Sequence, residues 1–132
     1  MGEAALRAYL APRVDVLIQF LIQDEPELDR WQSGVLTARG NRKPSYAALM
    51  LPLAQRDRTG RKTTLWGQIR PGTGPQRYRL EQLRNGVWTT VSGTKTTTAA
   101  GYFTRVVQAG EGAQFRVVDA ASGEKSPVLV VV

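Results

Sequence analysis

With 132 residues, 42% of them hydrophobic and 22% charged, the chain is long enough and apolar enough for one packed domain and an appendage, which excludes a disordered protein. The absence of histidine and cysteine excludes Ser-His-Asp and Cys-His nucleophiles, disulfides, and zinc sites built from imidazole or thiolate. The net charge is +7, and residues 56–132 carry all of the excess, with twelve basic and five acidic side chains spread over turns and strands.

The first part of the chain predicts a helix, a buried segment, a loop and a short second helix. Residues 3–10 favour a helix that Pro12 ends. Residues 14–22 are apolar and rich in β-branched side chains, which favours a buried strand, with a buried helix as the alternative. A solvated acidic loop is predicted at residues 24–29, and a turn at residues 40–44 precedes a helix over residues 46–50, capped by Ser45 and ended by Pro52.

Residues 56–63 are polar, charged and without periodicity, which predicts a linker between residues 1–55 and a β domain formed by residues 64–132. Short β-type runs separated by turn signals predict an antiparallel β-sandwich of six or seven strands. The runs cover residues 64–70, 76–84, 87–92, 102–109, 113–119 and 126–132, with a weaker edge strand at residues 94–98.

Several local signals refine the predicted sandwich. Asn85-Gly86 predicts a tight hairpin, and Ser122-Gly123 predicts the turn of the last one. Alternation places Phe103 on one face of its strand with residues 105 and 107. Residues 128–132 are apolar on both faces, which predicts a central strand, or one that another part of the protein covers. Residues 71–75 (PGTGP) predict a turn and not a phosphate-binding loop, because no helix begins there.

Four blocks of the first part resemble the end of the barrel in (β/α)8 glycoside hydrolases of the cellulase-like type. The blocks are residues 9–14 (YLAPRV), 19–24 (QFLIQD), 31–36 (WQSGVL) and 43–49 (KPSYAAL), and their order matches. The resemblance implies that residues 1–55 are a short α/β remnant of a TIM barrel. A complete barrel needs roughly 250 residues, so the N-terminal portion of such a barrel would be missing from this chain.

The second part resembles the immunoglobulin-like or fibronectin-like modules that bacterial secreted enzymes carry after their catalytic domain. Residues 65–71 (LWGQIRP), 98–103 (TAAGYF) and 126–128 (SPV) carry this likeness. Together the two resemblances imply a non-catalytic C-terminal accessory region of a secreted, extracellular glycoside hydrolase that acts on polysaccharide. The catalytic acid/base and nucleophile of such enzymes are two carboxylates on earlier strands. The resemblance therefore implies no catalytic residue, no metal and no cofactor in this chain.

The resemblance also singles out Trp31, which follows the presumed last barrel strand on the face where barrel active sites lie. In the intact parent enzyme its ring is expected to stack on a sugar, with core packing as the rival role. Trp66 and Trp88 lie within strand patterns, where tryptophan more often fills a sandwich core. Exposed on a flat face with Tyr78 or Tyr102, they would form a carbohydrate-contact surface.

Two other interpretations of the sequence remain open. A carbohydrate-binding or cell-surface adhesion module would show exposed aromatic side chains in a line. A basic nucleic-acid-binding protein is the weakest interpretation, because basic and aromatic residues do not interleave on one platform. The sequence predicts no membrane partner either: the apolar run at residues 16–22 contains Gln19 and is shorter than the roughly 20 residues of a membrane helix, and the N-terminus has no export or lipid signal.

Overall fold

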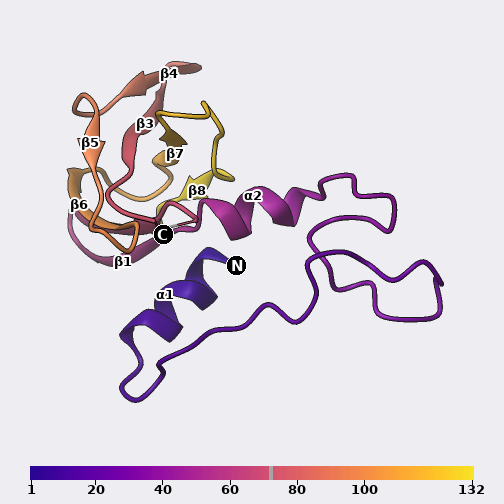
Figure 1. Ribbon diagram of the computed structural model, residues 1–132. Coiled ribbons are helices and arrows are strands. Elements are labelled where there is room, and N and C mark those ends of the chain that lie inside the picture. Colours follow the sequence, from indigo (N-terminus) through magenta and orange to yellow (C-terminus); the bar gives the residue numbers. More distant parts are fainter. Residues whose placement is uncertain (72) are drawn as a thin grey trace.

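The computed structural model describes residues 1–71 and 73–132, so Gly72 of the predicted turn lies outside the described residues. Helix α1 spans Gly2–Leu10, and helix α2 spans Pro44–Met50 (Figure 1). The strands are β1 (Leu53–Thr59), β2 (Lys62–Gln68), β3 (Arg77–Arg84), β4 (Val87–Thr90), β5 (Lys95–Thr96), β6 (Tyr102–Gln108), β7 (Gln114–Asp119) and β8 (Leu129–Val130).

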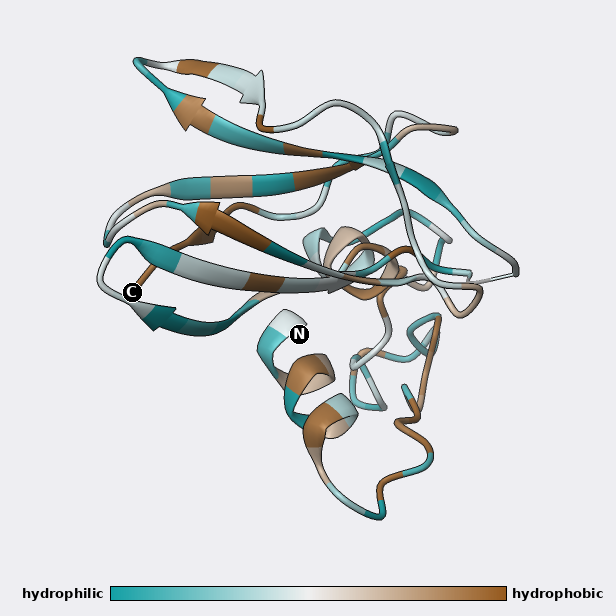
Figure 2. Cartoon of the chain, turned by 90° about the vertical axis from the view of Figure 1, so that its left-hand side faces the viewer, coloured by the Kyte–Doolittle hydropathy of each residue, from teal (hydrophilic) through white to brown (hydrophobic). Residues whose placement is uncertain are grey.

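The strands form two antiparallel sheets, so the predicted mainly β fold is confirmed. One sheet has the order β1-β2-β6, and the other has the order β4-β3-β7-β8 with β5 also paired to β3. Figure 2 shows the two sheets one above the other, with α1 and the segment that follows it beneath the three-stranded sheet. Each run that the sequence predicted as a strand overlaps one of β2 to β8, including the short edge strand β5.

The main core lies between the two sheets and is built by alternating side chains. Leu65 and Phe103 point inward from the three-stranded sheet, and Tyr78, Phe115 and Val117 point inward from the other. All five side chains are buried, and the rings of Tyr78 and Phe103 stack with centroids 4.2 Å apart. Burying each such side chain contributes about 1.5–3 kcal/mol, so this layer stabilises the sandwich.

The predicted hairpin turns are confirmed. Asn85 and Gly86 connect the paired residues Arg84 and Val87, and both have positive φ, at 50° and 78°. This conformation favours asparagine and glycine because they have the smallest steric penalty in the left-handed region. Gly123, at φ 75°, lies in the second predicted turn, where the Asp119 N–H donates to the Glu124 carbonyl.

The linker predicted at residues 56–63 is wrong, because these residues form the turn and the adjoining strand ends of the β1–β2 hairpin. Strand β1 pairs with β2 from Leu53 to Thr59, and Gly60 turns the chain with φ 59°. Residues 56–59 are exposed because β1 is an edge strand, and edge strands often carry charged side chains that deter further pairing. Their polarity indicates this edge position and not a flexible connection.

The buried strand or helix predicted at residues 14–22 is also wrong. The segment is irregular, and most of its apolar side chains are exposed. Within the described residues its backbone pairs with no strand, and the nearest β-pairing is the single bridge between Gln23 and Leu36. An apolar run predicts burial only where the rest of the fold supplies a surface to cover it.

Two smaller predictions fail at the ends of elements. Strand β8 lies at the edge of its sheet beside β7, and Val128, Val130 and Val132 are about half exposed or more, so the last strand is not central. The alternative, that another part of the protein covers it, stays a prediction. Helix α2 begins at Pro44, and Ser45 makes no capping hydrogen bond. Proline suits the first helical position because its φ is preset and its missing N–H would have no partner there.

Candidate functional site

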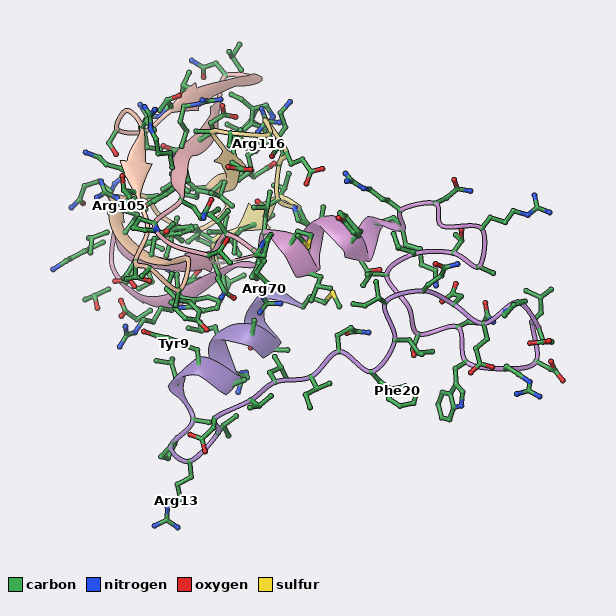
Figure 3. The ribbon with its side chains drawn as sticks, in the orientation of Figure 1. Tyr9, Arg13, Phe20, Arg70, Arg105 and Arg116 are labelled. Atoms are coloured by element: carbon green, nitrogen blue, oxygen red, sulfur yellow. The ribbon has the colours of Figure 1, made fainter. Side chains whose placement is uncertain are left out.

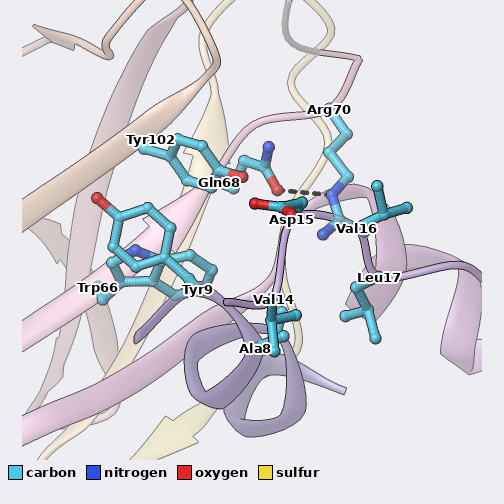
Figure 4. Close-up of a pocket in the computed structure, with 11 residues that line it drawn as sticks. Ala8, Tyr9, Val14, Asp15, Val16, Leu17, Trp66, Gln68, Arg70 and Tyr102 are labelled. Atoms are coloured by element: carbon cyan, nitrogen blue, oxygen red, sulfur yellow. Dashed lines mark hydrogen bonds between the residues drawn. The ribbon is translucent and has the colours of Figure 1, made fainter. Parts of the chain in front are cut away.

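A pocket of about 310 Å³ opens on the outer face of the three-stranded sheet, where α1 and residues 14–17 lie against it. This volume is at the lower end of the range of about 300–1,000 Å³ found for small-molecule sites. The chemistry-bearing side chains that line it are Tyr9 from α1, Asp15, Trp66 and Gln68 from β2, Arg70 and Tyr102 from β6 (Figure 4). We call it the aromatic pocket.

Helix α1 forms one wall of this pocket because one of its faces is buried on the sheet. Ala5 and Leu6 pack against Ala54 and Trp66 in a second, smaller core. Gly2 lets the helix approach β1 closely, since a Cβ there would come within 2.3 Å of the Leu53 carbonyl oxygen. The N-terminal region is therefore fastened to the sandwich by packing.

Three aromatic rings form one side of the aromatic pocket. The Tyr9 ring lies 5.3 Å from the Trp66 ring and 4.7 Å from the Tyr102 ring, measured between centroids. Trp66 is only 1% exposed and lies beneath the other two, whereas Tyr9 is 50% exposed. The exposed part of Tyr9 is thus held in a fixed orientation by the rings behind it, as preorganised binding surfaces require.

The other side of the aromatic pocket is polar. The Arg70 Nε donates to Gln68 Oε1 at 2.7 Å, drawn as a dashed line in Figure 4, and its Nη1 donates to the Leu49 carbonyl at 3.2 Å. Gln68 is in turn fixed by donating to the Ala100 carbonyl at 3.1 Å. Burial lowers the pKa of Arg70, but a guanidinium stays protonated at neutral pH.

Arg70 has unused hydrogen-bond donors, and the Asp15 carboxylate has unused hydrogen-bond acceptors. Two of the five N–H groups of Arg70 are used in the bonds above, and its guanidinium takes part in none of the ion pairs found among the described residues. Asp15 is exposed and takes part in none of the hydrogen bonds or ion pairs found among those residues. The pocket therefore offers a fixed cation, a carboxylate and an aromatic face to a bound molecule.

A second feature is an apolar surface on residues 14–31, which begin beside the aromatic pocket and then extend away from the sandwich past Phe20 (Figure 3). We call these residues the apolar segment. Ile18 is 79% exposed, Phe20 73% and Leu28 88%. Val14, Val16, Leu17, Ile22 and Trp31 are exposed as well. A contiguous run of this kind is uncommon on a free surface and is typical of one that another part of a protein covers.

Trp31 lies on this apolar segment, and it is 63% exposed. Its ring meets the edge of Phe20 at 6.0 Å, and Glu25, Asp29 and Arg30 lie beside it around a shallow depression. The Trp31 side chain is therefore not packed in a core, which was the rival role for it. The exposed ring is available for stacking.

Trp66 and Trp88 occupy different environments from the ones that the strand pattern suggests. Trp66 is buried, but under α1 and not between the sheets, because Leu65 takes the inward position on β2. Trp88 on β4 is half-buried, and the Arg116 guanidinium covers its ring at 4.2 Å while donating to Glu81. The two indoles lie on different sheets and do not form one line with Tyr78, which is buried.

The acidic residues 24–29 were predicted as a solvated loop, and Asp24 contradicts this. Asp24 is 7% exposed, and its Oδ2 lies 2.5 Å from the Lys43 Nζ. Its Oδ1 accepts a hydrogen bond from the Gly34 N–H. Asp24 therefore closes the loop from inside, while Glu25 and Glu27 lie 3.8 Å from Arg30 at the surface. Within the described residues, no three acidic side chains gather as metal ligands.

The sequence reasoning missed Tyr9, Asp15 and Arg70 as pocket residues. Tyr9 was part of a helical pattern, Asp15 interrupted an apolar run, and Arg70 was counted among dispersed basic residues. No spacing in the sequence links these three positions. A hint existed only in Trp66 and Gln68, whose i, i+2 spacing on a strand places them on one face.

The comparisons with known proteins identify no relative. No protein-family model matches the chain, and neither the curated proteins nor the solved structures contain a match. Within the described residues, neither helix is long and apolar enough to cross a membrane. The function must therefore be argued from the site itself.

Proposed function

We propose that this chain is a non-catalytic C-terminal accessory region of a secreted glycoside hydrolase that acts on polysaccharide. In this proposal the two sheets are an immunoglobulin-like module with a structural, spacing role. Residues 1–55 complete the end of a (β/α)8 barrel that another part of the parent enzyme supplies. Trp31 then lies at the mouth of that barrel, where its ring stacks on the sugar.

The apolar segment is the observation that carries the proposal. Its side chains, among them Ile18 and Phe20, are exposed, although the sequence is that of a buried strand. Neighbouring barrel strands would cover this surface and give its backbone hydrogen-bond partners. The packing of α1 on β1 and β2 supports the spacing role, because it fixes the sandwich against the region that would complete the barrel.

A chimera tests the proposal. The last strand, the last helix and the appended module of a cellulase-like glycoside hydrolase are replaced by residues 1–132, and hydrolysis of β-glucan is measured. We expect a soluble, active chimera, and we expect Phe20→Ser and Ile18→Ser to abolish its activity. Val87→Ser is the matched control, because Val87 is 61% exposed on β4 and lies far from the apolar segment in the sequence.

Two results would contradict the proposal. One is an inactive or insoluble chimera when the parent enzyme, with its own barrel end, is active under the same conditions. The other is an active chimera in which Phe20→Ser and Ile18→Ser have no more effect than Val87→Ser. In that case the apolar segment does not contact the barrel.

A further inference from the structure

We propose that the aromatic pocket is a binding site for a neutral pyranose unit of an oligosaccharide. The site is composed of this chain's own residues, and it adds a ligand-binding role to the structural one proposed above. It does not rest on the barrel, because α1, residues 14–17, β2, Arg70 and β6 build the pocket within this chain.

The aromatic side of the pocket suits the apolar face of a sugar ring. A pyranose presents several C–H groups on one face, and these pack on the face of an aromatic ring. Tyr9 is half exposed, and Trp66 and Tyr102 support it at centroid distances of 5.3 Å and 4.7 Å. Because the supporting rings hold Tyr9, little side-chain freedom is lost when a ligand binds.

The polar side of the pocket suits hydroxyl groups. A carboxylate accepts two hydrogen bonds from neighbouring hydroxyls, and the Asp15 carboxylate has no partner among the described residues. Arg70 offers unused N–H donors and is held by Gln68 at 2.7 Å and by the Leu49 carbonyl at 3.2 Å. Donors and acceptors on one side of a ring, opposite an aromatic face, match the alternating hydroxyls of a sugar.

The charges of the pocket favour a neutral ligand over an anion. Arg70 and Asp15 both line it, so the cation that would attract an anion is accompanied by a carboxylate that would repel it. The excess positive charge of the chain lies on residues 56–132 as a whole and not in the pocket. Binding of a neutral sugar should accordingly change little with salt, whereas binding of an anionic polymer to the surface should fall steeply.

Titration calorimetry on the full chain tests this site. The probes are cellohexaose, xylohexaose and mannohexaose, each at low salt and at about 0.3 M salt, where surface charges are screened. We expect one probe to bind with an affinity that salt hardly changes. Asp15→Ala and Tyr9→Ala should each lower that affinity at least tenfold, since a hydrogen bond to a charged group and a stacked ring each contribute on that scale.

Two variants serve as controls. Asp29→Ala removes an exposed carboxylate outside the pocket and should leave the affinity unchanged. Trp31→Ala removes the exposed indole of the apolar segment, and it should also have no effect. Asp15 is exposed and Tyr9 is half exposed, so their substitution should leave the thermal unfolding of the sandwich within a few degrees of the original chain.

The proposal is overturned if the unmodified chain binds none of the three probes at either salt concentration. It is overturned equally if binding survives Asp15→Ala and Tyr9→Ala but is lost in Trp31→Ala, which would place the sugar on the apolar segment. Neither result affects the chimera experiment, whose variants lie at positions that do not line the aromatic pocket.

Discussion

Substituting Leu6 tests whether α1 belongs to the same cooperative unit as the sandwich. Leu6 is 5% exposed and packs with Ala5, Ala54 and Trp66. Leu→Ala changes in cores cost about 2–5 kcal/mol, and the lower half of that range applies here because the helix lies on an outer face. Alanine has a better helix propensity than leucine, but this offsets only a few tenths of a kcal/mol of the loss. We therefore expect Leu6→Ala to lower the free energy of unfolding by about 2.5 kcal/mol.

Thermal unfolding measures this loss. Unfolding entropy is about 2.1 cal/mol/K per residue, which for a chain of 132 residues makes 2.5 kcal/mol equivalent to a fall in Tm of roughly 9 °C. Far-ultraviolet circular dichroism follows the sheets, and tryptophan fluorescence follows Trp66 beneath α1. Leu28→Ala is the control, because Leu28 is 88% exposed and its loss should change stability by no more than about 0.5 kcal/mol. If Leu6→Ala alters the fluorescence but moves Tm no more than Leu28→Ala does, α1 undocks separately and the reasoning is refuted.

Three further predictions concern charged side chains. Arg116→Met leaves Glu81, 13% exposed, without its cation; we expect a loss of about 3 kcal/mol in urea unfolding, partly restored by adding Glu81→Gln. Lys43→Met leaves the buried Asp24 carboxylate unpaired, so limited proteolysis within residues 25–33 should accelerate, and an unchanged cleavage rate would contradict the role given to this pair. Burial raises the pKa of Asp119, but the hydrogen bonds that its carboxylate accepts from residues 121 and 122 outweigh burial, so the pKa is lowered overall. A group with a lowered pKa stabilises the fold above its ordinary pKa near 4, and this contribution is lost as the pH falls through the lowered value. The free energy of unfolding in urea should therefore fall less between pH 5 and pH 2.5 for Asp119→Asn than for the original chain.

The β-rich part of the fold was predictable because its information is local. Short apolar runs, the Asn85-Gly86 turn and the alternation around Phe103 each depend on neighbouring residues, and the structure confirms them. Strand β1 was missed for a physical reason: only its first residues, Leu53 and Ala54, are buried, and the exposed residues 56–59 at its edge have no apolar alternation to detect. The position of β8 was misjudged because apolar residues on both faces predict a central strand only when both faces are covered.

The aromatic pocket could not be predicted, because it depends on which surface α1 covers. The alternation of β2 shows that Leu65 and Trp66 point to opposite faces, but it does not say that a helix from the other end of the chain buries Trp66. Tyr9 and Tyr102 are brought together by this docking, although 92 positions separate them. Long-range contacts of this kind leave no signal in composition or period.

The two proposals concern surfaces that share Val14, Val16 and Leu17, but each can be tested at side chains that belong to only one of them. Ile18 and Phe20 belong to the apolar segment and do not line the aromatic pocket, whereas Asp15 lines the pocket and carries no apolar surface. A partner that covers Phe20 therefore need not displace a ligand from Asp15. Phe20→Ser should change the chimera's activity without changing oligosaccharide affinity, and Asp15→Ala should do the reverse. If each variant changed both quantities, one surface would serve both roles, and the division drawn between segment and pocket would be wrong.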